Sequence, residues 1–266
     1  MTQEGKRRYL IEELLKERKE SAQIPADKKS QQDLLRALMN VRDPLPISQE
    51  FLQVQDEYLQ ERNKERGIIN IEDFECIKRI SEETGGQLYL WQGDITTLKV
   101  DAIVNAANAQ LLGCFSPLHA CIDNCIHTYA GIQLRLACYE LMQKQGKLEG
   151  TGLCKITQAF NLPSRFVLHT VGPIIRTVVG ARDKILLENC YKNCLDTAAE
   201  NGLESVAFCC ISTGVFRFPA DLAAQLAVKT VEEWLMANPE KSVKKVVFNV
   251  FGNKDLDIYK GIFGIK

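Results

Sequence analysis

The spacing of apolar residues divides this chain into a helical first third and a longer part that alternates between strand and helix patterns. Residues 7–20 place four apolar side chains at helical spacing among charges (Leu10, Ile11, Leu14 and Leu15). Ser30 is expected to cap a second helix, and Ser48, which follows Pro44 and Pro46, is expected to begin a third. Nothing in this region has a pattern typical of a reaction centre. We therefore expect residues 1–86 to form a helical extension that packs on the main domain.

Residues 87–266 alternate between short apolar runs and helical patterns. We expect strands over residues 88–91, 102–105, 156–160, 166–171, 205–211 and 246–251, and helices over residues 124–143, 184–200, 219–236 and 254–263. This alternation predicts an α/β fold in which a mostly parallel sheet is covered by helices on both faces. Ligands of such sheets bind beyond the carboxyl ends of the strands. The functional site is therefore expected in the loops after Trp91, Asn105, Ile211 and Phe251.

Composition and charge narrow the classes of function. The 266 residues carry a net charge of −1, whereas a general nucleic-acid-binding protein needs a basic face for its phosphate contacts. A bound phosphate would therefore be held by backbone amides. No apolar run approaches the roughly 18 residues of a membrane span, and the charged N-terminus lacks the pattern of a signal peptide. We expect a cytoplasmic protein with no nucleic-acid or membrane partner, whose 10 cysteines are free thiols.

Two of the expected loops carry side chains suited to polar recognition. Gly93-Asp94-Ile95-Thr96 follows the first strand, and its carboxylate can accept hydrogen bonds from an exocyclic amine such as that of adenine. Ordinary turn chemistry explains the same residues. Asn105 and Asn108, separated by two alanines, follow the second strand. Their amides either bind a polar ligand or satisfy the backbone of a buried turn, and the binding role is favoured for Asn108.

A third loop has the features of a phosphate cradle. Small residues stand between an expected strand and the helix that Pro219 opens, so successive backbone N–H groups can point inward beside a helix N-terminus. The loop consists of Ser212, Thr213, Gly214, Val215 and Phe216. Phe251 ends the last strand, where its ring either stacks on a planar base or packs in the core.

Four motifs, in this order along the chain, resemble the macrodomain family, an α/β module that binds ADP-ribose. They are Gly93-Asp94-Ile95-Thr96, residues 104–108 (Val-Asn-Ala-Ala-Asn), residues 167–173 (Val-Leu-His-Thr-Val-Gly-Pro) and residues 211–219. The resemblance covers residue 88 to the C-terminus. It implies a three-layer α/β/α sandwich with a mixed, mostly parallel sheet.

The resemblance also implies roles for the loop residues. Asp94 would bind the adenine amine, the backbone of Ile95 would line the same pocket, and Phe251 would pack on adenine. Residues 212–216 would wrap the diphosphate. Asn108 would reach the distal ribose. The expected ADP-ribose-binding residues also include Ile122 and Asp123, whereas His169, which lies within a strand, is expected to be structural.

Residues 113–127 depart from the family pattern and hold two of the three histidines and three of the ten cysteines. In macrodomains that hydrolyse ADP-ribosyl linkages, a glycine-rich run leads to an Asp just before a helix. This chain keeps Asp123 but replaces the glycines with residues 114–121 (Cys-Phe-Ser-Pro-Leu-His-Ala-Cys). The departure resembles the zinc-dependent macrodomain branch, whose members carry an N-terminal helical extension. This resemblance implies one Zn²⁺ held by Cys114, His119 and Cys121.

The spacing of these residues is compatible with a metal site. His119 and Cys121 can point to one side in a non-helical segment, and Cys114 can return across the Pro117 turn. Three such ligands leave the fourth tetrahedral position open, which is typical of a catalytic zinc. Cys125 and His127 fall inside a helical pattern and are expected in the core (residues 122–136).

From these residues we expect a hydrolase that releases ADP-ribose from mono-ADP-ribosylated proteins by cleaving the bond at the distal ribose. Asp123 would activate water or stabilise an oxocarbenium-like transition state, and Asn108 would orient the ribose. Zinc would bind a ribose hydroxyl or the water. Family analogy suggests a sirtuin-like ADP-ribosyltransferase as the source of the modification. Three alternatives stay open, namely a non-enzymatic ADP-ribose reader, an O-acetyl-ADP-ribose deacetylase and a purely structural zinc site.

Overall fold

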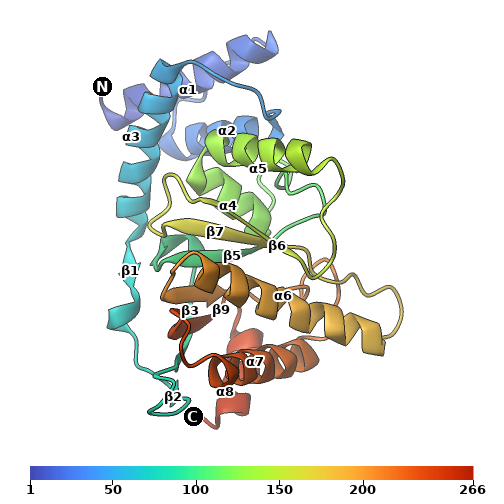
Figure 1. The fold of residues 1–266 in the computed structure, drawn as a ribbon. Coiled ribbons are helices and arrows are strands. Elements are labelled where there is room, and N and C mark those ends of the chain that lie inside the picture. The colour runs from blue at the N-terminus through green and yellow to red at the C-terminus, as the bar shows by residue number, and fades with distance from the viewer. Residues whose placement is uncertain (266) are drawn as a thin grey trace.

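The computed structural model describes residues 1–265 as a main α/β domain with three N-terminal helices packed on one side (Figure 1). The helices are α1 (Gln3–Arg18), α2 (Lys28–Val41), α3 (Gln49–Arg66), α4 (Ile122–Ala130), α5 (Ile132–Gln145), α6 (Ala181–Glu200), α7 (Ala220–Ala237) and α8 (Asn253–Phe263). The strands are β1 (Ile69–Asn70), β2 (Lys78–Arg79), β3 (Gln87–Gln92), β4 (Leu98–Lys99), β5 (Ala102–Ala106), β6 (Cys154–Gln158), β7 (Phe166–Thr170), β8 (Ser205–Phe208) and β9 (Lys245–Val250). Two 3-10 helices are η1 (Ile71–Asp73) and η2 (Ile95–Thr97).

The main sheet is mixed and mostly parallel, as the alternation of strands and helices predicted. Its seven strands run in the order β2-β3-β9-β8-β5-β7-β6. The five central strands are parallel, and the two edge strands, β2 and β6, are antiparallel to their neighbours. All four residues of β8 are buried, which is expected for a strand covered on both faces.

Helices cover both faces of this sheet, so the predicted three-layer architecture is confirmed (Figure 1). On one face, Phe208 of β8 and Phe248 of β9 are neighbours in register. The ring of Tyr191 from α6 lies 4.8 Å from that of Phe208, and the ring of Tyr259 from α8 lies 5.3 Å from that of Phe248. Helices α4 and α5 pack on the opposite face, where they contact β5 and β6.

The three N-terminal helices form a bundle with its own apolar core, which also takes in Ile132 of α5. Ser48 caps α3 as predicted, because its hydroxyl accepts a hydrogen bond from Phe51 N at 3.1 Å. The predicted cap at Ser30 was wrong. Asp27 caps α2 instead, since its carboxylate accepts from Ser30 N at 2.8 Å and Ser30 already lies in the first turn.

The chain joins the main domain soon after α3 ends at Arg66. Strand β1 pairs in parallel with β4, and β2 adds to the edge of the main sheet beside β3. Both short strands lie within residues 1–86, which were expected to form the helical extension.

The helix expected over residues 124–143 is two helices. Gly131 separates α4 from α5 with φ 100° and ψ 169°, a conformation that only glycine adopts readily. The strand expected over residues 205–211 ends at Phe208, and the one expected over 156–160 is shifted to Cys154–Gln158. After β8 the apolar run continues into a loop in which Cys209 and Ile211 are buried, whereas Phe160 after β6 is exposed. A run of apolar residues therefore does not mark where strand pairing stops.

Two expectations about the whole chain can be compared with the structure. All 10 cysteines are free. Among residues 1–265, no helix combines the length and the apolar character that crossing a membrane requires.

Replacing Gly131 with Ala should lower the free energy of unfolding by about 1–3 kcal/mol. The positive φ disfavours a side chain, and an added Cβ would lie 2.6 Å from Gln133 Oε1 and 2.7 Å from Gln55 Nε2. Gly261→Ala is the matched control, because Gly261 lies within α8 with no atom within 4 Å of an added Cβ. The free energy of unfolding of this control should rise by up to about 1 kcal/mol, because Ala is a better helix former than Gly. Urea unfolding followed by circular dichroism compares the two variants, and equal effects would contradict a special role for Gly131.

Candidate active site at the carboxyl ends of the strands

The loops that were expected to bind a ligand meet at one edge of the sheet. The parallel order β3-β9-β8-β5 brings the segments after these strands to the same side. Hydrogen bonds join the first loop to the last strand, since Gly93 N donates to Val250 O at 2.9 Å and Asn249 Nδ2 donates to Gly93 O at 2.9 Å. The expected site residues are therefore brought together by the topology.

Asp94 stands at the start of η2 with both carboxylate oxygens in hydrogen bonds. Its Oδ1 accepts from Thr96 N at 3.0 Å and from Thr96 Oγ1 at 2.6 Å. Its Oδ2 accepts from Arg66 Nη2 at 2.5 Å in an ion pair. The Arg66 guanidinium also lies 3.4 Å from the centroid of the Tyr129 ring. Because each carboxylate oxygen has two lone pairs and this side chain is 37% exposed, Asp94 keeps acceptor capacity for a ligand amine.

Ile95 and Phe251 differ sharply in their exposure. Ile95 is 1% exposed and lies in the core beneath the loop, so only its backbone can face a ligand. Phe251 is 78% exposed and follows the end of β9. Its exposure excludes the core role and leaves its ring available to stack on a planar base.

The loop of residues 212–216 offers a run of unpaired donors. Among residues 1–265, none of the amide N–H groups of Thr213, Gly214, Val215 and Phe216 donates a hydrogen bond. Ser212 adopts a left-handed conformation with φ 66°, and its carbonyl accepts from Phe218 N at 2.9 Å. A Cβ at Gly172 would lie 2.0 Å from Ser212 Oγ, so only glycine permits this close approach. Consecutive free amides are what a diphosphate requires from a protein without a basic face.

Asp123 lies in the first turn of α4 and is 5% exposed. Asn105 Nδ2 donates to its Oδ1 at 2.8 Å. Asn108 Nδ2 donates to Gly113 O at 3.0 Å and to Asp123 Oδ2 at 3.4 Å. Asn105 near the end of β5 and Asn108 in the loop after it therefore hold this carboxylate, and Asn108 also holds the backbone just before Cys114. For Asn105 the sequence left a ligand role and a backbone role open, and the structure shows a contact to a carboxylate instead.

The side chain of Asp123 is largely shielded from solvent. Burial raises the pKa of Asp123 to about 6, while the hydrogen bond from Asn105 and the charge of Arg135 act in the opposite direction. Burial also lowers the pKa of His127 well below its ordinary value, so this imidazole is neutral. His127 Nε2 lies 3.6 Å from Asp123 Oδ1, which is too long for a hydrogen bond. Neither ring nitrogen of His127 has a hydrogen-bond partner among residues 1–265.

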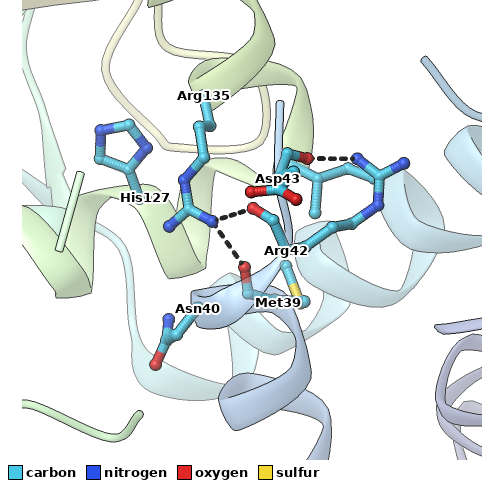
Figure 2. A pocket seen from close by; sticks show the side chains of 8 residues that line it. Met39, Asn40, Arg42, Asp43, His127 and Arg135 are labelled. Atoms are coloured by element: carbon cyan, nitrogen blue, oxygen red, sulfur yellow. Dashed lines mark hydrogen bonds between the residues drawn. The ribbon is translucent and has the colours of Figure 1, made fainter. Parts of the chain in front are cut away.

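A cavity of about 10 Å³ lies where α2 meets α4 and α5, bordered by His127 (Figure 2). Arg135 spans this boundary, because its Nη1 donates to Met39 O at 3.1 Å and to Arg42 O at 2.5 Å while its Nε donates to Leu112 O at 2.7 Å. The cavity has room for about one water molecule and not for a nucleotide. This cavity is therefore not the site of the expected ligand.

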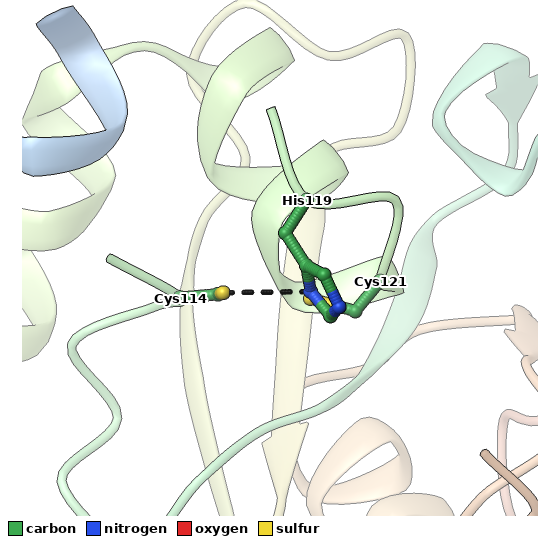
Figure 3. A group of neighbouring side chains, drawn as sticks. All are labelled: Cys114, His119 and Cys121. Atoms are coloured by element: carbon green, nitrogen blue, oxygen red, sulfur yellow. Dashed lines mark hydrogen bonds between the residues drawn. The ribbon is translucent and has the colours of Figure 1, made fainter. Parts of the chain in front are cut away.

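Cys114, His119 and Cys121 come together, as the family resemblance implied (Figure 3). Their ligand atoms all lie within 4.8 Å of one another, and Cys114 Sγ is 3.6 Å from His119 Nδ1. A turn in which His119 N donates to Ser116 O at 3.3 Å returns the chain across Pro117. In a tetrahedral zinc site, ordinary Zn–S and Zn–N bonds separate the sulfur and nitrogen atoms by about 3.5 Å. The three residues therefore fit a zinc ion.

The thiol of Cys121 is protonated without a metal. Burial raises the pKa of Cys121 to about 12, and the neighbouring Cys114 adds to the shift, whereas the hydrogen bond from Asn124 N lowers it. That hydrogen bond is 3.4 Å long and makes Cys121 the cap of α4. Binding of a metal by this thiol would release its proton.

A second group of possible metal ligands, His127, Cys138 and His169, is buried in the domain core. His169 Nε2 lies 2.9 Å from Thr157 Oγ1 and 3.7 Å from Cys138 Sγ. The burial of His127 and the internal partners of His169 agree with the structural roles predicted for both. Cys125 belongs to neither group and is half-buried beside Arg36.

Four contributors to the site were missed in the sequence, namely Arg36, Asn40, Arg66 and Arg135. Arg36 and Asn40 contact the Cys-His-Cys loop from α2, through His119 O at 2.8 Å and Leu118 N at 3.1 Å. None of the four lies in a motif. Arg66, for example, ends a helix, where basic residues are common for electrostatic reasons alone.

Comparisons with known proteins agree with this geometry. The Macro domain family model matches residues 104–227. A "Protein-ADP-ribose hydrolase" of Treponema medium is 56% identical over 261 residues, which covers 97% of this chain and 98% of that protein. One from Staphylococcus aureus (strain MSSA476) is 48% identical and covers 96% of this chain and 94% of its own. The chain belongs to the macrodomain family.

Solved macrodomains have the same fold. The Oceanobacillus iheyensis macrodomain with ADP is 37% identical, with a TM-score of 0.61 over 68% of this chain and 92% of that one. The Trypanosoma brucei macrodomain in complex with ADP-ribose is 26% identical, with a TM-score of 0.66 over 85% of this chain and 94% of that one. A "Probable bifunctional ADP-ribose hydrolase/ADP-ribosyltransferase" of Fusarium oxysporum f. sp. cubense is 40% identical over 87% of this chain, which spans 40% of that longer protein.

The raised pKa of Asp123 predicts a pH dependence of the stability of this macrodomain. Between the ordinary value of 3.8 and about 6, the folded protein binds more protons at this site than the unfolded chain does. The free energy of unfolding should therefore fall as the pH rises through this window, by up to about 3 kcal/mol, and stay lowered above it. Asp123→Asn should remove this dependence. Urea unfolding at pH 4 and pH 7 in the presence of a chelator measures it, and a constant difference between the two proteins would contradict the assignment.

Proposed function

We propose that this macrodomain is a protein-ADP-ribose hydrolase, which releases ADP-ribose from mono-ADP-ribosylated protein side chains by cleaving the bond at the distal ribose. Relatives that bear this name are 48% and 56% identical over nearly the whole chain. The observation that carries the proposal is the buried carboxylate of Asp123, held by Asn105 and Asn108 where the nucleotide-binding loops converge. A protein that only bound ADP-ribose would have little need for it.

The loops divide into parts that bind and a part that reacts. Asp94 and Phe251 would hold adenine, and the free amides of residues 213–216 would hold the diphosphate. This binding energy is remote from the broken bond and serves to place the distal ribose. Ile122, the first residue of α4 and half-buried, would line the ribose end of the pocket.

Asp123 would act at the anomeric carbon. With a pKa of about 6 it is mostly ionised at neutral pH, so it can accept a proton from the attacking water. The same negative charge can stabilise the positive charge of an oxocarbenium-like transition state. Asn108 would keep the carboxylate and the ribose in register, because its amide reaches Asp123 Oδ2 and the backbone of the next loop.

We further propose one zinc ion as the cofactor, held by Cys114, His119 and Cys121. Support comes from the 3.6 Å separation of Cys114 Sγ and His119 Nδ1 and from the exposed flank that this loop presents beside α4. When bound in a three-ligand site, zinc supplies a Lewis acid with one open position. A structural zinc would instead close its fourth position with a fourth protein ligand.

Two statements about the cellular setting stay proposals. The source of the modification would be an ADP-ribosyltransferase, and the Fusarium relative whose name joins both activities supports such a pairing. The sirtuin-like type of that enzyme is a prediction from family analogy, and a cytoplasmic location is a prediction from the sequence.

Asp123→Ala and Asn108→Ala should each lower the rate of ADP-ribose release about 100-fold or more, because each removes a group that acts in the transition state. The affinity for free ADP-ribose should change by less than about threefold. Release from a mono-ADP-ribosylated protein and calorimetric binding measure the two effects. Asp257→Ala, which removes an exposed carboxylate on α8, is the control. Full activity of Asp123→Ala would contradict the assignment, and wild-type protein that binds without releasing ADP-ribose would be a reader.

Cys114→Ser should lose bound zinc and activity, because a hydroxyl replaces one of three ligands. Cys76→Ser is the matched control, since Cys76 is half-buried and lies in neither metal-ligand group. Elemental analysis gives the zinc content, and the release assay is run with a chelator and after zinc is restored. Equal activity with and without the chelator would refute zinc dependence. Loss of the folded state on zinc removal would favour a structural ion, and mass analysis of the product separates hydrolysis of a glycosidic bond from deacylation of O-acetyl-ADP-ribose.

A further inference from the structure

Helix α2 of the N-terminal extension contacts the Cys-His-Cys loop, here defined as residues 114–121, at several backbone groups. The loop has no helix or strand of its own, and much of it is exposed. A short exposed loop would have to be ordered each time it bound a metal, which weakens binding unless other elements hold it in place. Hydrogen bonds to the loop come from two residues of α2, Arg36 and Asn40, and from Asn124 of α4. The guanidinium of Arg135 in α5 also lies 4.2 Å from the centroid of the Phe115 ring.

Asn124 connects the two ends of the loop. Its Nδ2 donates to Ser116 O at 3.0 Å and to Cys114 O at 3.3 Å, and its backbone N donates to Cys121 Sγ at 3.4 Å. The side chain is 0% exposed, so its amide must have internal partners. Because its nitrogen faces two carbonyls, its oxygen faces the other way and requires a donor.

Arg36 supplies that donor. Its Nη2 donates to Asn124 Oδ1 at 2.8 Å and to His119 O at 2.8 Å, and its Nε lies 3.3 Å from the same Asn124 oxygen. One guanidinium therefore fixes the side-chain amide that holds the carbonyls of Cys114 and Ser116, and it also holds the backbone of His119. The planar guanidinium of arginine carries several N–H donors in a fixed arrangement, so it can reach both acceptors at once. The ammonium of lysine is a single compact charge and cannot reproduce this arrangement.

Asn40 holds the loop one helical turn further along α2. It is 1% exposed, its Oδ1 accepts from Leu118 N at 3.1 Å, and its Nδ2 donates to Thr128 Oγ1 at 3.0 Å. Leu118 directly precedes His119. Its φ of 58° is unfavourable for a leucine. Thr128 Oγ1 in turn donates to Asn124 O at 2.8 Å. Arg36 and Asn40 therefore both hydrogen-bond to side chains of α4, at Asn124 and Thr128.

We propose that Arg36 and Asn40 are positioning residues that preorganise Cys114, His119 and Cys121 for the metal, so that the N-terminal extension is a working part of the active site. Residues four apart on a helix lie on one face, which is why α2 can present both to the loop. This inference rests on the zinc site of the proposed function, but its structural part, a loop ordered by α2, holds for the metal-free protein as well.

The first measurement uses metal-free protein in a chelator. Arg36→Ala should raise the rate at which iodoacetamide alkylates Cys114 and Cys121 at least fivefold, as followed by peptide mass spectrometry. Cys76, which lies outside the loop, is the internal reference and should not change. Arg8→Ala, which removes an exposed arginine of α1 in the same extension, is the matched control and should alkylate like wild type.

The second measurement is the zinc dissociation constant, obtained by competition with a chromophoric chelator. Arg36→Ala and Asn40→Ala should raise the zinc dissociation constant at least tenfold. The constant for Arg36→Lys should lie between those of the two alanine variants and that of the wild-type protein. Alkylation rates and zinc affinity that both equal those of wild type would overturn the inference. If the wild-type protein binds no zinc, the proposed cofactor fails while the alkylation rates alone decide the ordering of the loop. If Arg36→Ala does not fold, Arg36→Lys and Asn40→Ser are measured in its place.

Discussion

The structure of the site depends on the burial of one carboxylate. Asp123 is 5% exposed, and a buried carboxylate is tolerated only where donors meet it. Asn105 and Asn108 provide these donors from the end of β5, and the start of α4 adds the favourable end of a helix. The raised pKa of Asp123 shows that this compensation is incomplete. A carboxylate whose pKa is raised towards neutrality is suited to proton transfer near neutral pH. A fully solvated carboxylate, with its lower pKa, is not.

The nucleotide loops owe their position to the parallel order of the strands. Because β3, β9, β8 and β5 all run in one direction, the loops proposed to bind adenine, diphosphate and ribose lie at one edge of the sheet. The net charge of −1 matters here, since the loop proposed to bind the diphosphate offers free amides and no lysine. Gly172 has a part in this arrangement although it touches no ligand, because Ser212 packs where a side chain would stand.

The N-terminal extension contacts both ends of the site. Arg66, at the end of α3, pairs with Asp94 and lies on Tyr129, while α2 contacts the Cys-His-Cys loop. Arg135 ties the same helix to α5 through the carbonyls of Met39 and Arg42 (Figure 2). An isolated main domain would leave Asp94 with an unpaired charge and the loop without its partners. The helices therefore belong to the functional unit, although their sequence contains only the pattern of a packed bundle.

The sequence alone was sufficient for the features that depend on local pattern. Alternating apolar runs predicted the α/β class and Ser48 marked the start of α3. The family resemblance singled out Cys114, His119 and Cys121, whose spacing is compatible with their approach. The tertiary structure decided what depends on distant partners. Gly131 divides a continuous helical pattern, Phe251 is exposed at the end of a strand, and Arg36 and Arg66 contact residues 83 and 28 positions away. Local periodicity records which face of an element is buried, but the partner of a charged side chain is set only when the elements pack against one another.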